Sequence, residues 1–289
     1  MQARDVSAPD ARSAWRPDCS CAAGAAAALR ELGLLLPELE PYQDEPPQMA
    51  SGAVGKMGYL RLQFDRDPAT GRTVLSDMDR RVPLLAQKAL YWDESQPDMA
   101  CVTTITTTGC VIQGDRLALD VRVGPEARAL VATQSATKVH CMEHNYASQL
   151  QTFTVEEDGY FEYMPDPLIL HRTARYLMDT RIVLPESATL LYGEVLMPGR
   201  KYHHRDELFG FHLFSSNITA AREPYGDPLF VERFVLEPGR MDFGKAGVMG
   251  PFEVFGNVIA LTPARHFDAL RDGIGADATP DLAWGATVL

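Results

Sequence analysis

The sequence predicts an all-β fold, a right-handed β-helix-like solenoid of stacked sheets with a few short helices. Several segments alternate apolar and polar residues with a period of two, which is typical of half-buried strands. Three similar turns, at 123–127, 155–159 and 184–188, follow one another after 32 and then 29 residues. Stacked coils of a solenoid give such a repeat, although a sandwich of long hairpins would give a similar spacing.

The amino-terminal part is predicted to be an extension, partly disordered, over residues 1–50. It contains an alanine-rich stretch suited to one helix and then a proline- and acid-rich segment, 37–49, which is expected to form an irregular tether. The β domain is expected over 51–275, and a carboxy-terminal tail over 276–289.

Within the β domain, alternation predicts strands in the segments 58–64, 117–123, 176–184 and 228–236. Near the carboxy terminus, a threonine followed by a proline predicts the start of a helix at 262–263. That helix is expected to run to about residue 271 and to pack through Phe267 and Leu270.

The segment 188–196 is also predicted to be a strand, and it carries a carboxylate on its apolar face. Glu194 shares that face with Leu190, Tyr192 and Leu196. A carboxylate among such side chains needs a partner, a cation or water, because an unpaired buried charge is costly.

The composition is that of a globular protein with a strong acidic excess. The formal net charge is −12 over 289 residues and the pI is near 5.0. Nucleic acids and anionic membranes attract basic surfaces, so neither is expected as a partner, whereas proteins or cations are. The apolar run 21–36 is interrupted by Arg30 and Glu31, and is therefore not interpreted as a signal peptide.

Cysteine usage and hydropathy both favour a cytoplasmic location. The five cysteines are odd in number and form no C-x-x-C pair, which fits a reducing compartment better than a disulfide framework. Cys19 and Cys21 are interpreted as free thiols in preference to metal ligands. No run reaches the roughly 18 apolar residues that cross a bilayer.

Familiar catalytic signatures are absent from the sequence. The segment 109–115 has the G-x4-G frame of a phosphate loop, but Asp115 stands where a lysine is required and would repel a phosphate. Nucleotide binding is therefore rejected. No Ser-His-Asp order, nucleophile elbow, H-E-x-x-H or dinucleotide fingerprint is recognisable.

Two histidine clusters are candidate metal ligands. His203 and His204 precede Asp206 and Glu207, with His212 further on, and a loop would let both adjacent histidines reach one ion. A second group, His140, Cys141 and His144, has donors suited to nickel or zinc. For both clusters a solvated polar loop is the favoured interpretation, and no stable metal site is predicted.

Three acidic residues form a further candidate set, namely Glu162, Asp166 and Glu194. Asp166 lies between two prolines, which restrict its backbone and therefore the direction of its side chain. Each carboxylate has the alternative role of accepting a backbone amide or pairing with an arginine such as Arg172, Arg175 or Arg200. The residues alone leave both interpretations open.

Five motifs, in order and spacing, resemble the UreD (UreH) family of urease accessory proteins over about 46–271. They are Gly109-x4-Gly114-Asp115-Arg116, Thr133-Gln134-Ser135-Ala136-Thr137-Lys138, Glu162-Tyr163-Met164-Pro165-Asp166-Pro167, Pro198-Gly199-Arg200 and Glu207-Leu208-Phe209.

The resemblance implies an all-β, β-helical fold and a scaffold that is not an enzyme. Such a scaffold binds apo-urease subunits on one side and UreF on the other, and UreF recruits the GTPase UreG. No cofactor is expected to stay bound, and nickel is expected in transit through a water-filled tunnel. The residues expected to border this path are Asp115, Glu162, Asp166, Glu194 and Glu207. The motif residues given a structural role are Gly109, Gly114, Thr133, Gln134, Lys138, Pro165, Gly199 and Arg200.

The chain also departs from the family pattern. Cys110 and Gln113 replace one glycine each of two Gly-Gly pairs, and a Cβ there would disfavour a backbone with positive φ. Asp206 replaces a glycine before Glu207. The alternatives are a diverged paralogue with another partner, a metal-dependent β-fold enzyme using His203, His204 and Glu207, or an interaction module without a metal path.

Overall fold

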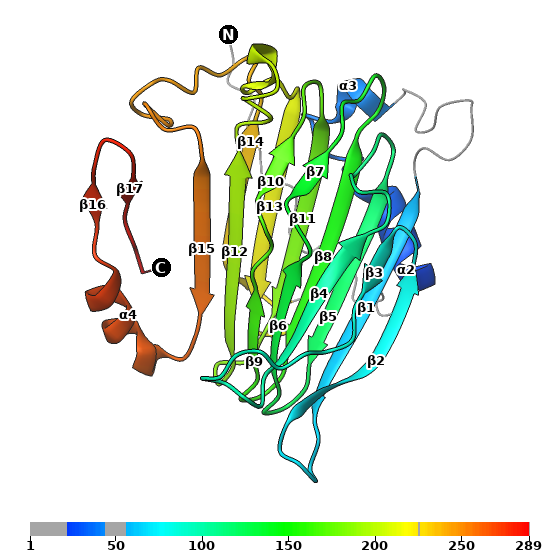
Figure 1. Cartoon of the computed structure of the whole chain (residues 1–289), viewed down its shortest axis with the longest axis vertical. Helices are drawn as coiled ribbons and strands as arrows, with labels where there is room; N and C mark the ends of the chain where they lie inside the picture. The colour runs from blue at the N-terminus through cyan, green and yellow to red at the C-terminus, as the bar shows by residue number, and fades with distance from the viewer. Residues whose placement is uncertain (1–21, 44–55, 225, 289) are drawn as a thin grey trace.

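The computed structural model describes residues 22–43, 56–224 and 226–288, and two sheets that face each other form its body (Figure 1). The first sheet has the order β14-β13-β11-β8-β5-β1-β2. Its strands are β1 (Met57–Arg66), β2 (Thr73–Arg81), β5 (Arg116–Val123), β8 (Ala147–Val155), β11 (Arg175–Val183), β13 (Leu213–Ala221) and β14 (Pro228–Leu236).

The second sheet has the order β3-β4-β6-β9-β12-β10-β7, with β15 paired to β12. Its strands are β3 (Leu84–Ala86), β4 (Ala100–Thr106), β6 (Arg128–Thr133), β7 (Thr137–Val139), β9 (Tyr160–Tyr163), β10 (Leu168–Leu170), β12 (Thr189–Met197) and β15 (Phe255–Leu261). A small hairpin of β16 (Asp277–Ala278) and β17 (Ala283–Trp284) lies outside both sheets.

The predicted all-β solenoid is wrong, because the described residues form a mixed α/β structure with parallel and antiparallel strands. The inner strands of the first sheet are parallel, but β2 and β14 pair antiparallel at its edges. In the second sheet, β3 pairs antiparallel with β4, and β15 pairs antiparallel with β12. The repeated turns mark where the chain leaves β5, β8 and β11 for the second sheet. That spacing carries no information about the edge strands or the helices.

The inner faces of the two sheets form the main core. The predicted alternation along β1 is confirmed, since Leu60, Leu62 and Phe64 are all fully buried. Aromatic rings join the sheets at its centre, where the Phe153 ring centroid lies 4.8 Å from that of Tyr163. Burying apolar surface contributes about 25 cal/mol per Å², so this face is the main source of stability.

The amino-terminal helices pack on the outer face of the first sheet. The predicted alanine-rich helix is present as α2 (Ala22–Glu31), and a short helix α3 (Glu40–Gln43) follows. Leu29 and Leu39 are buried there, and the Tyr146 hydroxyl donates to the Leu32 carbonyl over 3.1 Å. This part of the predicted extension is therefore packed on the domain. Residues 1–21, with Cys19 and Cys21, and residues 44–55 lie outside the described residues.

The carboxy-terminal segment lies beside β15, away from the sheets (Figure 1). A 3-10 turn, η3 (Ala264–His266), leads into α4 (Phe267–Ile274), which confirms the predicted helix. The predicted packing face is wrong, because Phe267 and Leu270 are 37% and 38% exposed. In the described part of the chain, every helix is too short or too polar to cross a membrane.

Candidate functional site

A cavity of about 70 Å³ lies between the two sheets. At roughly 10–15 Å³ of such volume per water, it has room for about five water molecules. Both sheets contribute, including Gln149 and Gln151 from β8, Tyr176 from β11, and Tyr192 and Glu194 from β12.

Neutral hydrogen-bonding groups lie among the apolar side chains that line this cavity. Gln151 Nε2 donates to the Tyr163 hydroxyl over 2.8 Å, and Thr180 Oγ1 donates to Gln151 Oε1 over 2.9 Å. The Tyr176 hydroxyl donates to Gln149 Oε1 over 2.7 Å. Burial raises the pKa of Tyr163 and Tyr176 well above the ordinary value, so both phenols stay protonated.

Glu194 lines the cavity on the side of β15 and lies on the same face of β12 as Tyr192 and Leu196, which is the face that the alternation predicted. The Tyr192 hydroxyl lies 3.5 Å from Glu194 Oε2, and Asn257 Nδ2 lies 3.4 Å from Oε1. Asn257 also donates to Glu232 Oε1 over 3.0 Å. Burial raises the pKa of Glu194 to about 7, and the negative charge of Glu232 adds to this shift, against the Asn257 hydrogen bond. The group therefore exchanges a proton near neutral pH.

Asp166 also lines the cavity, next to Pro165 and Thr133. Its backbone N–H donates to Thr133 Oγ1 over 2.9 Å, and its side chain is exposed. Two of the five predicted path residues, Asp166 and Glu194, thus meet at one cavity.

A second pocket, of about 110 Å³, shares several lining residues with the first, including Thr133. Four of the motif residues assigned a structural role line it: Gly109, Thr133, Gln134 and Lys138. Two of the five motifs, the turn that begins at Gly109 and the segment 133–138, therefore meet at this pocket.

Asp115 is fully buried and holds a turn together. Its Oδ1 accepts the Lys56 N–H and its Oδ2 accepts the Ile112 N–H, both over 2.9 Å. Burial raises its pKa, although these two donors oppose the shift. The cavity lining does not include Asp115.

The glycines of that turn explain how two departures from the family pattern are tolerated. Gly109 and Gly114 have φ of 70° and 76°, whereas Cys110 and Gln113 do not have positive φ. Gln113 instead accepts two backbone N–H groups, those of Glu143 and His144, over 3.0 Å each. The retained glycines occupy the positions that need them.

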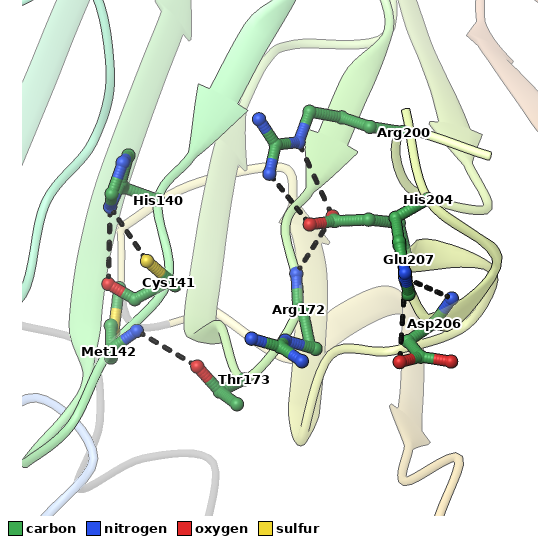
Figure 2. Close-up of polar contacts among 9 residues, drawn as sticks. All are labelled: His140, Cys141, Met142, Arg172, Thr173, Arg200, His204, Asp206 and Glu207. Carbon is green, nitrogen blue, oxygen red and sulfur yellow. Dashed lines mark hydrogen bonds and ion pairs between the residues drawn. The ribbon is translucent and has the colours of Figure 1, made fainter. Parts of the chain in front are cut away.

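Glu207 is buried and forms an ion pair with Arg200, as Figure 2 shows. Arg200 Nη2 lies 2.6 Å from Glu207 Oε1, and the Arg172 N–H donates to Oε2 over 3.1 Å. Burial opposes ionisation, but these two donors hold the pKa of Glu207 below its ordinary value. The backbone of Gly199, with φ of 111°, passes so close to Glu207 that a Cβ would clash with the Glu207 carbonyl.

Glu162 lies on β9, and the Tyr160 hydroxyl donates to its Oε1 over 2.5 Å. Burial and this hydrogen bond raise the pKa of Tyr160 to about 12. Glu162, like Asp115 and Glu207, is absent from the cavity lining and has a partner within the chain.

His203 and His204 are exposed in a turn near Glu207. His204 Nδ1 accepts the Asp206 N–H over 3.2 Å (Figure 2), so its ring is part of a local turn. Among the described residues, no group of three or more His, Cys, Asp or Glu side chains is arranged to hold a metal ion. Because the Glu207 carboxylate is paired with Arg200 and the His204 ring accepts a backbone N–H of its own turn, the geometry does not favour a hydrolase built on His203, His204 and Glu207.

The sequence interpretation missed the neutral side chains of the cavity. Gln149 and Gln151 share one face of β8 with Phe153, and this period of two places them on the inner face. It also missed His171, which follows β10 and is only 4% exposed.

Comparisons with known proteins agree on one family. A urease accessory protein UreD of Yersinia enterocolitica is 54% identical over 265 residues, covering 89% of this chain and 80% of that protein. One from Photorhabdus laumondii is 55% identical over 260 residues with the same coverage, and one from Yersinia pestis is 57% identical over 239 residues, covering 83% and 85%. Because the family model described as UreD urease accessory protein also matches residues 56–289, this chain belongs to the UreD family of urease accessory proteins.

Proposed function

We propose that this chain is an accessory scaffold in the maturation of urease and is not an enzyme. In this proposal it bridges apo-urease and the UreF–UreG complex, and nickel passes along it toward the urease active site. The observation that carries the accessory role is family membership across residues 56–289. The odd number of cysteines supports a cytoplasmic location for this work.

The cavity between the sheets supports the nickel part of the proposal. It combines two carboxyl groups, Asp166 and Glu194, with neutral oxygen donors in a space suited to a few waters. An ion in transit needs binding sites that hold it strongly enough for it to enter and weakly enough for it to leave. A carboxyl group that is half protonated near pH 7 is such a weak site.

The geometry divides the five predicted path residues into two groups. Asp166 and Glu194 line the cavity and are the favoured nickel contacts. Asp115, Glu162 and Glu207 already accept hydrogen bonds or an ion pair inside the chain. We therefore assign a structural role to these three.

The test is co-expression of this chain with UreF, UreG and the urease subunits of the same source, followed by co-purification and a urease assay with nickel supplied. The expected result is a stable complex, and urease activity that is lost when this chain is omitted. Failure to bind either urease or UreF, with both partners shown to be folded, would refute the scaffold. Full activity without this chain would refute the accessory role.

Charge-removing variants test the nickel path in the same system. Asp166→Asn and Glu194→Gln are expected to lower urease activation while the complex still assembles. Glu157→Gln is the matched control, because Glu157 is exposed in a turn away from the cavity. Activation by both cavity variants at the level of Glu157→Gln would show that nickel does not use this cavity.

A further inference from the structure

His171 is a buried histidine whose ring has no hydrogen-bond partner. It is 4% exposed, and neither Nδ1 nor Nε2 has a partner among the described residues. Buried polar side-chain atoms are nearly always hydrogen-bonded, so a buried ring with both nitrogens unpaired is a candidate for binding a ligand. Burial, together with the charge of Arg200, lowers the pKa of His171 to about 4. A neutral imidazole has one ring nitrogen with a lone pair that can bind a metal ion.

Two further metal-binding side chains lie beside this ring because of strand register. β7 and β10 are parallel and pair Val139 with Leu170, so the next residues, His140 and His171, are neighbours. Their ring centroids are 5.4 Å apart with an interplanar angle of 54°. Cys141 Sγ lies 3.1 Å from His140 Nδ1 (Figure 2).

The spacing matches that of ligands around one ion. Two imidazoles bound at about 2.0–2.1 Å to a tetrahedral ion have ring centroids roughly 5 Å apart. The three donor groups do not yet surround a common point, in keeping with the lack of a preformed site among the described residues. His140 and Cys141 are exposed, so their side chains can rotate toward the fixed ring of His171.

We propose that His171, His140 and Cys141 bind one borderline divalent transition-metal ion, Zn²⁺ or Ni²⁺, with solvent at the fourth position. Imidazole and thiolate donors favour these ions over Mg²⁺ and Ca²⁺. On binding, the Cys141 thiol releases its proton to solvent and becomes a thiolate.

Neighbouring charges set the expected strength of this site. Arg200 and Lys138 both act on His171 as positive charges, which disfavours a cation, and Glu207 offsets Arg200. The thiolate supplies a further negative charge. The result is an open, three-ligand site that exchanges its metal with solvent from the side of His140 and Cys141.

The sequence had grouped His144 with His140 and Cys141, and His144 now serves as the matched control. It is exposed, and its backbone N–H is held by Gln113 on the adjoining turn. The site does not depend on the proposed accessory role, because binding is measured on the isolated chain. Metal binding and urease activation can therefore fail separately.

The test is a titration of the purified full-length chain with Co²⁺, followed by displacement with Zn²⁺ and Ni²⁺. The expected result is one equivalent of Co²⁺ with a thiolate-to-cobalt charge-transfer band. Cys141→Ser should abolish the band, and His140→Asn should weaken binding at least tenfold, whereas His144→Asn should bind as the wild type does. Both altered ligands are exposed, so these variants are expected to fold. A wild type without the band, or Cys141→Ser and His140→Asn variants with unchanged affinity, would overturn the proposal.

Discussion

At Glu194 a single carboxyl group links the cavity to the stability of the whole chain. Its pKa is raised from 4.5 to about 7 in the folded protein. Between these two values the folded state binds more protons than the unfolded state, so stability falls as the pH rises through this window. The stabilisation associated with the protonated Glu194 carboxyl is fully present below about pH 4.5 and is lost above about pH 7.

The variant Glu194→Gln should remove this pH dependence. Relative to wild type, it should gain about 1–3 kcal/mol of unfolding free energy between pH 5 and pH 8. Urea unfolding at several pH values measures this. Asp120, whose pKa is raised to about 6, titrates in both proteins and therefore cancels in the comparison. If the unfolding free energies of the two proteins instead changed with pH in parallel, the Glu194 carboxyl would be exposed to water in the folded protein.

The ion pair between Arg200 and Glu207 gives a second prediction for single residues. Arg200→Met should leave Glu207 buried and uncompensated, at a cost on the order of 1–3 kcal/mol at pH 7, since Arg200 itself is 38% exposed. The pKa of Glu207 is lowered, so the pair stabilises above the ordinary pKa of 4.5 and this stabilisation is lost as pH falls.

Chemical unfolding of Arg200→Met, Glu207→Leu and the double variant checks this prediction. The double variant should be more stable than Arg200→Met, because no unpaired charge remains. The gap between Arg200→Met and wild type should also shrink toward pH 4. A constant gap at all pH values would contradict an electrostatic cause.

For single residues, the sequence predicted which face of a strand a side chain occupies better than it predicted the hydrogen-bond or ion-pair partner of that side chain. Alternation placed Glu194 on the inner face of its strand, and the structure agrees. For Asp115 and Glu207, partners such as the Lys56 N–H and Arg200 depend on loop paths that periodicity does not encode. His171 was missed because its environment comes from strand register between β7 and β10.

Among the elements, α2 tests whether the amino-terminal segment belongs to the folded body. Leu29 is buried between α2 and the first sheet, whereas Leu35 is 80% exposed. Leu29→Ala should lose about 2–4 kcal/mol of unfolding free energy, because it leaves a cavity. Leu35→Ala should stay within about 0.5 kcal/mol of wild type. Equal unfolding curves for the two variants would mean that α2 is undocked in solution.

Strand positions were predictable from alternation, but their assembly was not. The segments predicted near β1, β5, β11, β12 and β14 all form strands. Their repeat of about 30 residues predicted one continuous solenoid. The antiparallel edges formed by β2, β3, β14 and β15 close the sheets differently, because hairpin pairing depends on turn geometry and on neighbouring strands.

For the whole molecule, the body and the carboxy-terminal segment differ in how they bury apolar side chains. The body has a continuous core between its sheets, from β1 to β15. Beyond Pro263, no described residue is buried. The large apolar residues exposed there are Phe267, Leu270, Ile274, Leu282, Trp284 and Val288. Stability is therefore expected to reside in the body.

Two truncations test this division. A chain that ends at Pro263 keeps β15 and should unfold within about 0.5 kcal/mol of the full chain, because none of the removed residues that the structure describes is buried. A chain that ends at Val254 also loses β15, which pairs with β12 throughout its length and packs Ile259 and Leu261 against the core. This shorter chain should lose several times more unfolding free energy, and its cavity-lining Glu194 should lose the Asn257 hydrogen bond. Equal losses for the two truncations would instead mean that the segment after Pro263 packs on the body in solution.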